Sequence, residues 1–277
     1  MTYDDVVKWW QSKNLQSLAD YTEALSNFRI LFACNSSVIE GASITYHTTR
    51  EVFEDNKVTD FTGDLRDILE MQNQKFAFEY ICKALIDKKP VNIQFIKKVH
   101  RLLLYGCYDN RRWEKGERPG SFKQNDYCVG VTSEGSYPEY VEEDLTELLE
   151  EVDKFNDSNP LIVASYMHLR FEQIHPFADG NGRVGRLLMN YYLLSHGYPP
   201  TVIFDEDKET YYLALTVFDK AEEVTGFIDF IKEETVKTWD NYVERVRKNA
   251  PTLWKSLSDY DLLDNTKRAM DKVKGDG

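Results

Sequence analysis

A base, an acid, a glycine-rich turn and two arginines stand within twelve residues of this chain, in the stretch HPFADGNGRVGR from His175 to Arg186. A histidine has an unperturbed pKa near ~6.5, so His175 can take a proton from a hydroxyl group at neutral pH. A carboxylate such as Asp179 is a hard oxygen ligand that suits Mg²⁺, an ion that proteins usually hold together with substrate phosphates. These residue types predict transfer chemistry on a phosphate compound.

The glycine-rich turn opens directly onto a predicted helix. Residues 179–182 read Asp-Gly-Asn-Gly, which supplies the positive φ angles of a tight reversal, and residues 183–196 follow at helical spacing. Free backbone N–H groups and the helix dipole make such a start an anion site. Arg183 and Arg186 share one face of the first turn, where their charges oppose the dipole. A polyphosphate ligand would remove that conflict.

A second helix must hold the histidine in place. Asn159 and Pro160 form an N-cap and a first helical residue, and apolar residues then recur at helical spacing up to Ile174. Pro176 ends the helix and favours extended geometry at the residue before it, which is His175. The imidazole should therefore leave the helix at a fixed point.

Each residue of this stretch also has an ordinary structural interpretation. A histidine beside a proline often only packs or caps, a DGNG turn is often only a turn, and arginines at a helix start are often solvated or paired with acids. Together in one window, these interpretations would require several coincidences. The combination favours a site.

Residues 175–186 resemble the H-P-F-x-D-G-N-G-R-x-x-R signature of the Fic family, and every specified position matches. The resemblance implies an all-α fold, a helical bundle with a small β-hairpin flap next to the active-site loop. It implies a Mg²⁺-dependent enzyme that moves AMP from ATP onto a Ser, Thr or Tyr hydroxyl of a target protein. In this family the roles fall on the following residues: His175 as the base, Asp179 on Mg²⁺, Gly180, Asn181 and Gly182 around the phosphates, and Arg183 and Arg186 on the β and γ phosphates.

A second motif precedes this region, in the sequence SSVIEG at residues 36–41. Ser36 and Glu40 share a helix face, and Gly41 is a natural C-terminal stop. A carboxylate in the last turn interacts unfavourably with the helix dipole, at a cost of about 0.3 to 1 kcal/mol. A cation should therefore face it. The segment resembles the S/T-x-x-x-E-G/N inhibitory motif of one class of Fic proteins. That resemblance implies that Glu40 pairs with Arg186 and keeps it from the γ-phosphate, whereas the plainer alternative is a surface glutamate at a frayed helix end.

Glycines and prolines punctuate residues 112–140, and Tyr127 to Thr132 is the best strand or hairpin segment of the chain. In Fic proteins a hairpin flap covers the active site and pairs with an extended target segment through backbone hydrogen bonds. By that resemblance, the flap residues near the nucleotide are Arg118, Val129, Gly130, Val131 and Thr132. The alternative is an ordinary surface hairpin.

Another helix is predicted to begin at Thr210, and it carries Tyr211 and Tyr212 near its start. Relatives place an aromatic pair here against the adenine, and these two tyrosines match that pair. Asp219 stands where relatives often have an asparagine that reads the base edge. An ionised acid accepts hydrogen bonds but donates none, so the choice of base is less certain than the phosphate chemistry.

The remaining periodic segments are predicted to be core helices: residues 4–32 as one or two helices, 64–87, 92–105 with a structural His100, and 226–247. We therefore expect N-terminal helices over residues 1–60 with the inhibitory segment, a core domain over 61–248 with the signature, and a tail over 249–277.

Composition limits the other partners and the compartment. The net charge of −13 would repel nucleic acid and an anionic membrane. No signal-peptide pattern or run of about 18 apolar residues is present, so the cytosol is the expected location. The four cysteines show no C-x-x-C spacing, which suits reduced thiols better than disulfides.

Two alternatives to adenylyl transfer stay open at this stage. One is a Fic fold with another donor, since relatives also transfer UMP, phosphate or phosphocholine. Gly180, Gly182 and Arg183 favour a nucleotide, because relatives that phosphorylate their targets replace part of this turn. The other is a nucleotide-binding regulatory module with negligible turnover. The sequence also leaves open the target protein, self-modification and homo-oligomer formation.

Overall fold

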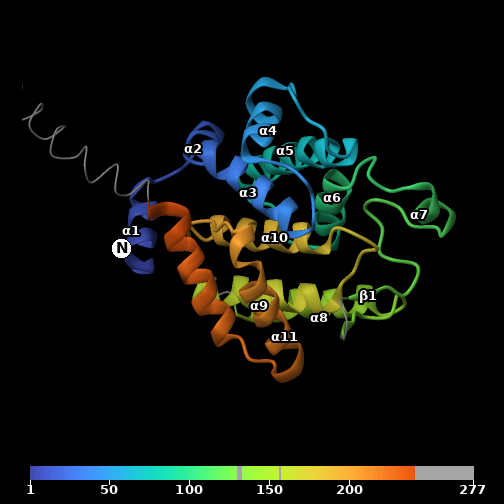
Figure 1. Ribbon diagram of the computed structural model, residues 1–277. Coiled ribbons are helices and arrows are strands. Elements are labelled where there is room, and N and C mark those ends of the chain that lie inside the picture. The colour runs from blue at the N-terminus through green and yellow to red at the C-terminus, as the bar shows by residue number, and fades with distance from the viewer. Residues whose placement is uncertain (130–132, 156, 241–277) are drawn as a thin grey trace, which may run out of the picture.

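Helix α10 (Asn181–Ser195) lies at the centre of the computed structural model, which describes residues 1–129, 133–155 and 157–240 (Figure 1). Helices α3 (Ser26–Ile39), α5 (Leu65–Ile86) and α6 (Ile93–Leu103) pack along one side of it, and α9 (Pro160–Ile174) packs along the other. Residues of α10 are buried from Val184 to Leu194, so neighbours cover the helix on every side.

The other elements surround this centre. They are α1 (Tyr3–Ser12), α2 (Leu18–Ala24), α4 (Tyr46–Arg50), the π-helical turn Glu51–Asp55, α7 (Asn110–Glu114), α8 (Val141–Lys154), the 3₁₀ turn Asp205–Asp207, α11 (Lys208–Ala221) and a last helix over residues 225–240. Strands β1 (Cys128–Val129) and β2 (Ser133–Glu134) form one short antiparallel pair, with Cys128 opposite Glu134. Helices thus make up nearly all of the described regular structure.

The N-terminal region contains three helices, where one or two were predicted. Ser17 caps the second helix, since its hydroxyl accepts from the amide of Asp20 and the Asp20 carboxylate accepts from the amide of Ser17. This capping box breaks the apolar pattern that suggested a longer helix. The third helix, α3, continues through the SSVIEG segment and ends at Ile39, with Gly41 at φ 92° just beyond it.

Two backbone predictions at the signature were wrong in detail. Helix α10 begins at Asn181 and not at residue 183, because Gly180 alone supplies the left-handed turn, at φ 83°. His175 was expected to be extended, but it takes the left-handed conformation at φ 50° and ψ 62°. Its amide donates to the carbonyl of Phe171 at 3.0 Å and so caps α9.

An aromatic cluster joins the first helix to the last described one. The ring of Trp239 lies 5.4 Å from that of Trp9, 5.1 Å from that of Trp10 and 5.7 Å from that of Phe28. The same hydrophobic core extends from these rings to the signature helices. The N-terminal helices are therefore packed into the core that holds the signature, and a domain boundary near residue 60 stays a prediction.

Several sequence-based expectations concern thiols, membranes and the chain end. Cys34, Cys82 and Cys107 are buried and unpaired, as expected for reduced thiols. None of the helices in residues 1–129, 133–155 and 157–240 is long and apolar enough to cross a bilayer. The predicted flap residues 130–132, the end of the last core helix beyond residue 240 and the predicted tail 249–277 lie outside the described residues.

Replacing Trp239 by alanine should lower the free energy of unfolding by about 3 to 5 kcal/mol, as is typical for a buried tryptophan. The side chain is 1% exposed and donates its indole N–H to the carbonyl of Pro200 at 2.7 Å. Urea unfolding followed by circular dichroism measures the change. Trp113→Ala is the matched control, since Trp113 is 47% exposed. Equal losses in the two variants would contradict the importance of the aromatic cluster.

Candidate active site

His175 stands at the end of α9, where the chain leaves the helix toward the signature loop. Two segments that flank β1 and β2 form hydrogen bonds with the backbone on either side of His175. The amide of Ser136 donates to the carbonyl of Ile174 at 2.9 Å, and the amide of Lys123 donates to the carbonyl of Pro176 at 3.0 Å. A Cβ on Gly135 would lie 2.7 Å from that of His175, so only glycine fits there. The segments on either side of the β1–β2 pair are therefore fixed against the histidine.

The environment of His175 keeps its imidazole neutral. Burial, and after it the neighbouring Lys123 ammonium, lower the pKa of His175 to about 4. Lys123 is itself buried, and burial lowers the pKa of its amine. A neutral imidazole is the form that can accept a proton.

The loop between His175 and α10 is held by its own polar groups. The side chain of Asn181 accepts from the amide of Phe177 at 2.9 Å and donates to the carbonyl of Phe177 at 2.8 Å. Gly180 lies so close to Leu104 that a Cβ there would collide with it. The Asn181 side chain is thus occupied by the loop, and only its backbone amide could face a ligand.

His100 supports this loop from α6. Its ring stacks on Phe177 with centroids 3.7 Å apart, its Nε2 lies 3.0 Å from the carbonyl of Asp179, and its Nδ1 accepts from the amide of Gly120 at 2.7 Å. Burial lowers the pKa of His100 to about 3. The structural role predicted for His100 is consistent with these contacts, although the residue lies nearer to the site than its sequence position suggested.

Arg186 is buried and contacts the C-terminal end of α3. Its Nη2 lies 2.8 Å from Oε1 of Glu40 and 2.9 Å from the carbonyl of Ser36, and its Nε donates to Oγ of Ser36 at 3.0 Å. The Arg186 side chain is only 2% exposed, whereas that of Glu40 is 31% exposed. The cation predicted to face Glu40 is therefore present, and it is Arg186.

The carboxylate of Glu40 also lies at the start of α10. A Cβ on Gly182 would collide with Oε1 of Glu40 and would approach Nη1 of Arg186 to 2.9 Å. The first backbone hydrogen bond of α10 runs from the amide of Val184 to Gly180, so the amides of residues 181–183 precede it. Glu40 thus occupies the place where an anion would meet this helix N-terminus. Gly182 is required for that close approach and not, as predicted, for a positive φ angle.

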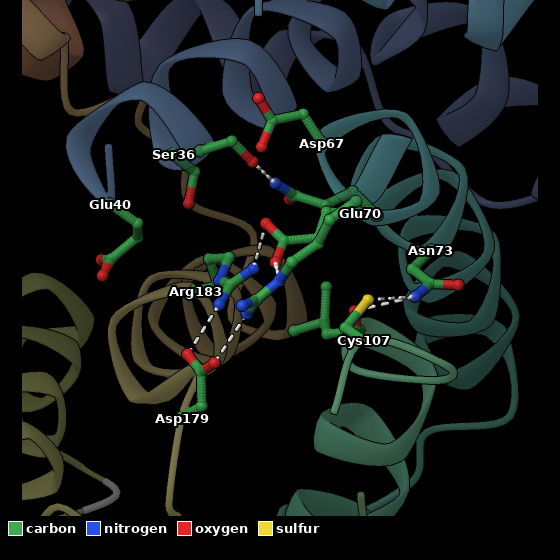
Figure 2. Close-up of polar contacts among 12 residues, drawn as sticks. Ser36, Glu40, Asp67, Glu70, Asn73, Cys107, Asp179 and Arg183 are labelled. Carbon is green, nitrogen blue, oxygen red and sulfur yellow. Dashed lines mark hydrogen bonds and ion pairs between the residues drawn. The ribbon is translucent and has the colours of Figure 1, made fainter. Parts of the chain in front are cut away.

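Arg183 is held between two carboxylates, as Figure 2 shows. Its Nη1 lies 2.5 Å from Oε2 of Glu70, and its Nη2 lies 3.0 Å from Oδ1 of Asp179. The side chains of Arg183 and Glu70 are 3% and 7% exposed, so this ion pair is buried. Two further cations, Arg66 and Arg112, lie 2.7 and 3.3 Å from Oδ2 of Asp179. The helix predicted over residues 64–87 contributes to the core, as expected, and its Glu70 also reaches the candidate site.

Asp179 suits a Mg²⁺ ion in charge but is fully engaged by arginines. Although burial acts in the opposite direction, Arg183 and Arg66 hold the pKa of Asp179 below its ordinary value. No group of three His, Cys, Asp or Glu side chains that could hold a metal occurs among the described residues. A single carboxylate such as that of Asp179 fits Mg²⁺, which proteins usually hold by one or two carboxylates together with substrate phosphates.

The two predicted adenine-contacting tyrosines differ in exposure. Tyr211 is buried, and its hydroxyl contacts Nε2 of His168 at 3.0 Å and Nη1 of Arg186 at 3.5 Å. Tyr212 is 44% exposed and donates to the carbonyl of Ile39 at 3.2 Å. Only Tyr212 presents a ring that a ligand could reach in this conformation.

For the predicted flap residues the structure describes less. Val129 lies in β1 and pairs with Ser133, whereas Gly130, Val131 and Thr132 fall outside the described residues. Arg118 bonds to the carbonyls of Trp113 and Glu117. Buried Glu117 accepts from the amide of Gln124, the side-chain amide of Asn125 and the hydroxyl of Tyr127, and so orders the approach to β1.

Comparison with known proteins gives one family. The model of the Fic/DOC family matches residues 90–193. "Protein adenylyltransferase Fic" of Drosophila persimilis is 30% identical over 261 residues, which cover 86% of this chain and 48% of that protein. The protein of the same name in Drosophila mojavensis is 29% identical over 285 residues, which cover 94% of this chain and 53% of that protein. The chain thus spans about half the length of the curated relatives that it matches.

Solved structures agree with the family match. A Fic domain containing signaling protein from Bacteroides thetaiotaomicron superposes with a TM-score of 0.73 at 26% identity, over 85% of this chain and 93% of that one. Fic-1 from C. elegans superposes with a TM-score of 0.72 at 23% identity, over 89% of this chain and 71% of that one. This likeness supports the fold. With this fold, the matched region and the complete signature at residues 175–186, the chain contains a domain of the Fic/DOC family over residues 90–193.

Proposed function

We propose that this chain is a Mg²⁺-dependent protein adenylyltransferase, which transfers AMP from ATP to a Ser, Thr or Tyr hydroxyl of a target protein. The observation that carries the proposal is the position of the Glu40 carboxylate, which rests on Arg186 and on the first turn of α10, beside the loop that bears His175. A carboxylate of the protein itself at the start of α10 indicates that an anion can bind there. The name of the Drosophila relatives, "Protein adenylyltransferase Fic", supports the same activity.

In the proposed reaction, the neutral imidazole of His175 takes the proton of the target hydroxyl as that oxygen attacks the α-phosphorus of ATP. The bond from the α-phosphorus to the bridging oxygen breaks, and pyrophosphate leaves. The amides at the start of α10 and the guanidinium of Arg186 bind the phosphate oxygens and stabilise the charge of the leaving group. Arg183 fixes Asp179 and Glu70 around this centre.

Asp179 would hold the Mg²⁺ ion, because it is the acidic residue of the signature and its carboxylate lies next to the proposed phosphate site. When bound, Mg²⁺ would neutralise phosphate charge and orient the leaving group. The cofactor set is therefore Mg²⁺, with ATP as co-substrate.

We infer further that Glu40 restrains the enzyme. Its carboxylate occupies the anion position, and it engages the same Nη2 of Arg186 that a terminal phosphate would need. The serine of the same motif also contributes, since Ser36 binds Arg186 through both its hydroxyl and its carbonyl. Segment 36–41 would thus act as an inhibitory motif, carried by the N-terminal helices of residues 1–60.

The target would bind at the hairpin region. Its base is joined to the backbone around His175, so a segment that added to this edge would present a hydroxyl near the imidazole. Recognition through the backbone supports a flap role for residues 129–132 with few side-chain requirements. The chain spans about half the length of these adenylyltransferase relatives, so the range of targets is part of the proposal.

The base pocket would use Tyr212 as its aromatic platform, because its ring is exposed. Burial raises the pKa of Asp219, which lies seven residues further along α11. An ionised Asp219 could accept a hydrogen bond from an exocyclic amine such as that of adenine, but it could not donate one to a ring nitrogen.

Loss of the base should abolish the reaction but not nucleotide binding. In a Glu40→Gly background, His175→Ala should slow AMP transfer by about 10² to 10⁴, the usual contribution of a general base. Intact-mass measurement after incubation with Mg²⁺ and ATP, with and without protein extract as a target source, detects the added AMP. His47→Ala is the control, since the side chain of His47 is 79% exposed on α4. Undiminished transfer by His175→Ala would refute the assignment of the base.

Removal of the restraint should increase the rate. Glu40→Gly should label faster than wild type by at least about tenfold, because freeing a charged partner is worth about 1.5 to 3 kcal/mol of new phosphate contact. Glu222→Gly is the matched control, since Glu222 also caps a helix C-terminus. Equal labelling by wild type and Glu40→Gly would exclude inhibition by this residue.

The pH dependence follows from the depressed pKa of His175, which is about 4. A lowered pKa keeps the imidazole in its neutral, basic form to lower pH. We expect the labelling rate of Glu40→Gly to stay nearly constant between about pH 8 and 5.5, where a free histidine would lose half its activity near pH ~6.5. Lys123→Met should raise the pKa of His175 and move the acid limb to higher pH. A half-maximal rate near pH ~6.5 in the Glu40→Gly parent would contradict the predicted environment.

A further inference from the structure

Two arginines from outside the signature lie at the edge of the candidate site. Arg66 belongs to the first turn of α5, and Arg112 belongs to the short helix α7. Both point a terminal nitrogen at Oδ2 of Asp179, at 2.7 and 3.3 Å. Neither was singled out from the sequence, because they are 113 and 67 residues away from Asp179.

The four arginines of the site differ in access to solvent. The side chains of Arg183 and Arg186 are 3% and 2% exposed, while those of Arg66 and Arg112 are 36% and 28% exposed. The buried pair faces Glu70 and Glu40, and the exposed pair stands between Asp179 and solvent. The four guanidinium groups face Glu40, Glu70, Asp179 and Asp109, so a ligand with further negative charge would find cations already gathered at this place.

This arrangement leaves Asp179 no capacity for a metal ion by itself. Three cations already share its two oxygens. A divalent ion at about 2.1 Å from the same carboxylate would stand against Arg66 and Arg112, and the repulsion would exclude it unless new negative charge entered at the same time. A polyphosphate brings that charge.

Both arginines have supports that would stay in place if Asp179 turned to a metal. Arg66 donates from Nε to Oε1 of buried Glu70 at 2.9 Å. The guanidinium of Arg112 lies 5.6 Å from the ring centre of Tyr108 and 3.6 Å from Oδ2 of Asp109. Nε of Arg112 is buried and has no hydrogen-bond partner in the described part of the chain. Arg112 is therefore the more loosely engaged donor.

We propose that Arg112 and Arg66 form an additional subsite for the terminal phosphates of a nucleoside triphosphate, and that they move from Asp179 to those phosphates when the metal and nucleotide bind together. The inference rests on the proposed function and adds two residues to its phosphate site. Before ligand binding, the two arginines neutralise Asp179 in place of the metal. After binding, they contact the phosphates of the leaving group. The inference also requires that metal and triphosphate enter as a unit.

The test is calorimetric binding in a Glu40→Gly, His175→Ala parent, where turnover is prevented. ATP and AMP are titrated with Mg²⁺ into the parent, into Arg112→Gln and into Arg111→Gln, whose arginine is the exposed neighbour on α7. Arg112→Gln should weaken ATP binding by at least about tenfold, as expected for a lost charge-assisted hydrogen bond, and should leave AMP binding within about twofold. Arg111→Gln should change neither affinity. Retained AMP binding also shows that the variant is folded.

A second measurement follows the metal without nucleotide. Mn²⁺ titration by electron paramagnetic resonance should show weak binding to the parent and tighter binding to Arg112→Gln, because one of the cations on Asp179 is gone. Unchanged or tighter ATP binding by Arg112→Gln would overturn the inference, since a residue that only neutralises Asp179 would behave in that way. A parent that binds AMP and ATP equally well would also overturn it, while a parent that binds neither would refute the proposed function itself.

Discussion

A helix that starts inside a protein, with two buried arginines in its first turns, requires negative charge around it. The dipole of α10 and the cations of Arg183 and Arg186 add at the same end, and burial makes each unpaired charge costly. Glu40, Glu70 and Asp179 provide the balance, from the end of α3, from α5 and from the signature loop. The carboxylates that neutralise the positive charge at the start of α10 therefore bring distant segments together. The same ion pairs belong both to the candidate site and to the fold.

The two buried arginines are compensated in different ways. Arg183 is paired with Glu70, whose side chain is 7% exposed and which α5 holds rigidly. Arg186 is paired with Glu40, which lies at the last turn of α3 and is 31% exposed. A buried pair is expensive to break because one charge stays behind unpaired, whereas an exposed carboxylate can exchange its partner for water. One arginine is thus a fixed part of the architecture, and the other is available to a competing anion.

Local patterns in the sequence predicted the elements that carry the site. Apolar periodicity predicted α6 to within two residues at each end, and the Asn159–Pro160 start predicted where α9 begins. The signature indicated His175, Asp179 and the arginines as candidate site residues. Pairing between Glu40 and Arg186 was implied by family resemblance, since the two residues are 146 positions apart. Arg66, Glu70 and Arg112 were missed for the same reason: partners far apart in the chain leave no periodic signal, and a buried glutamate in a helix looks like any polar position. The left-handed backbone of His175 was missed because a following proline usually favours extended geometry.

The segments that flank the β1–β2 pair are joined to the backbone around His175 by the amides of Lys123 and Ser136 and by the close approach of Gly135. Hydrogen bonds between backbone groups do not depend on side-chain identity, apart from the glycine that gives them room. Substitutions between the two anchoring residues, Gly135 apart, would therefore leave these backbone hydrogen bonds in place. In the proposed enzyme, such a layout would let the residues that meet a partner differ between proteins while the backbone that holds the imidazole stays the same.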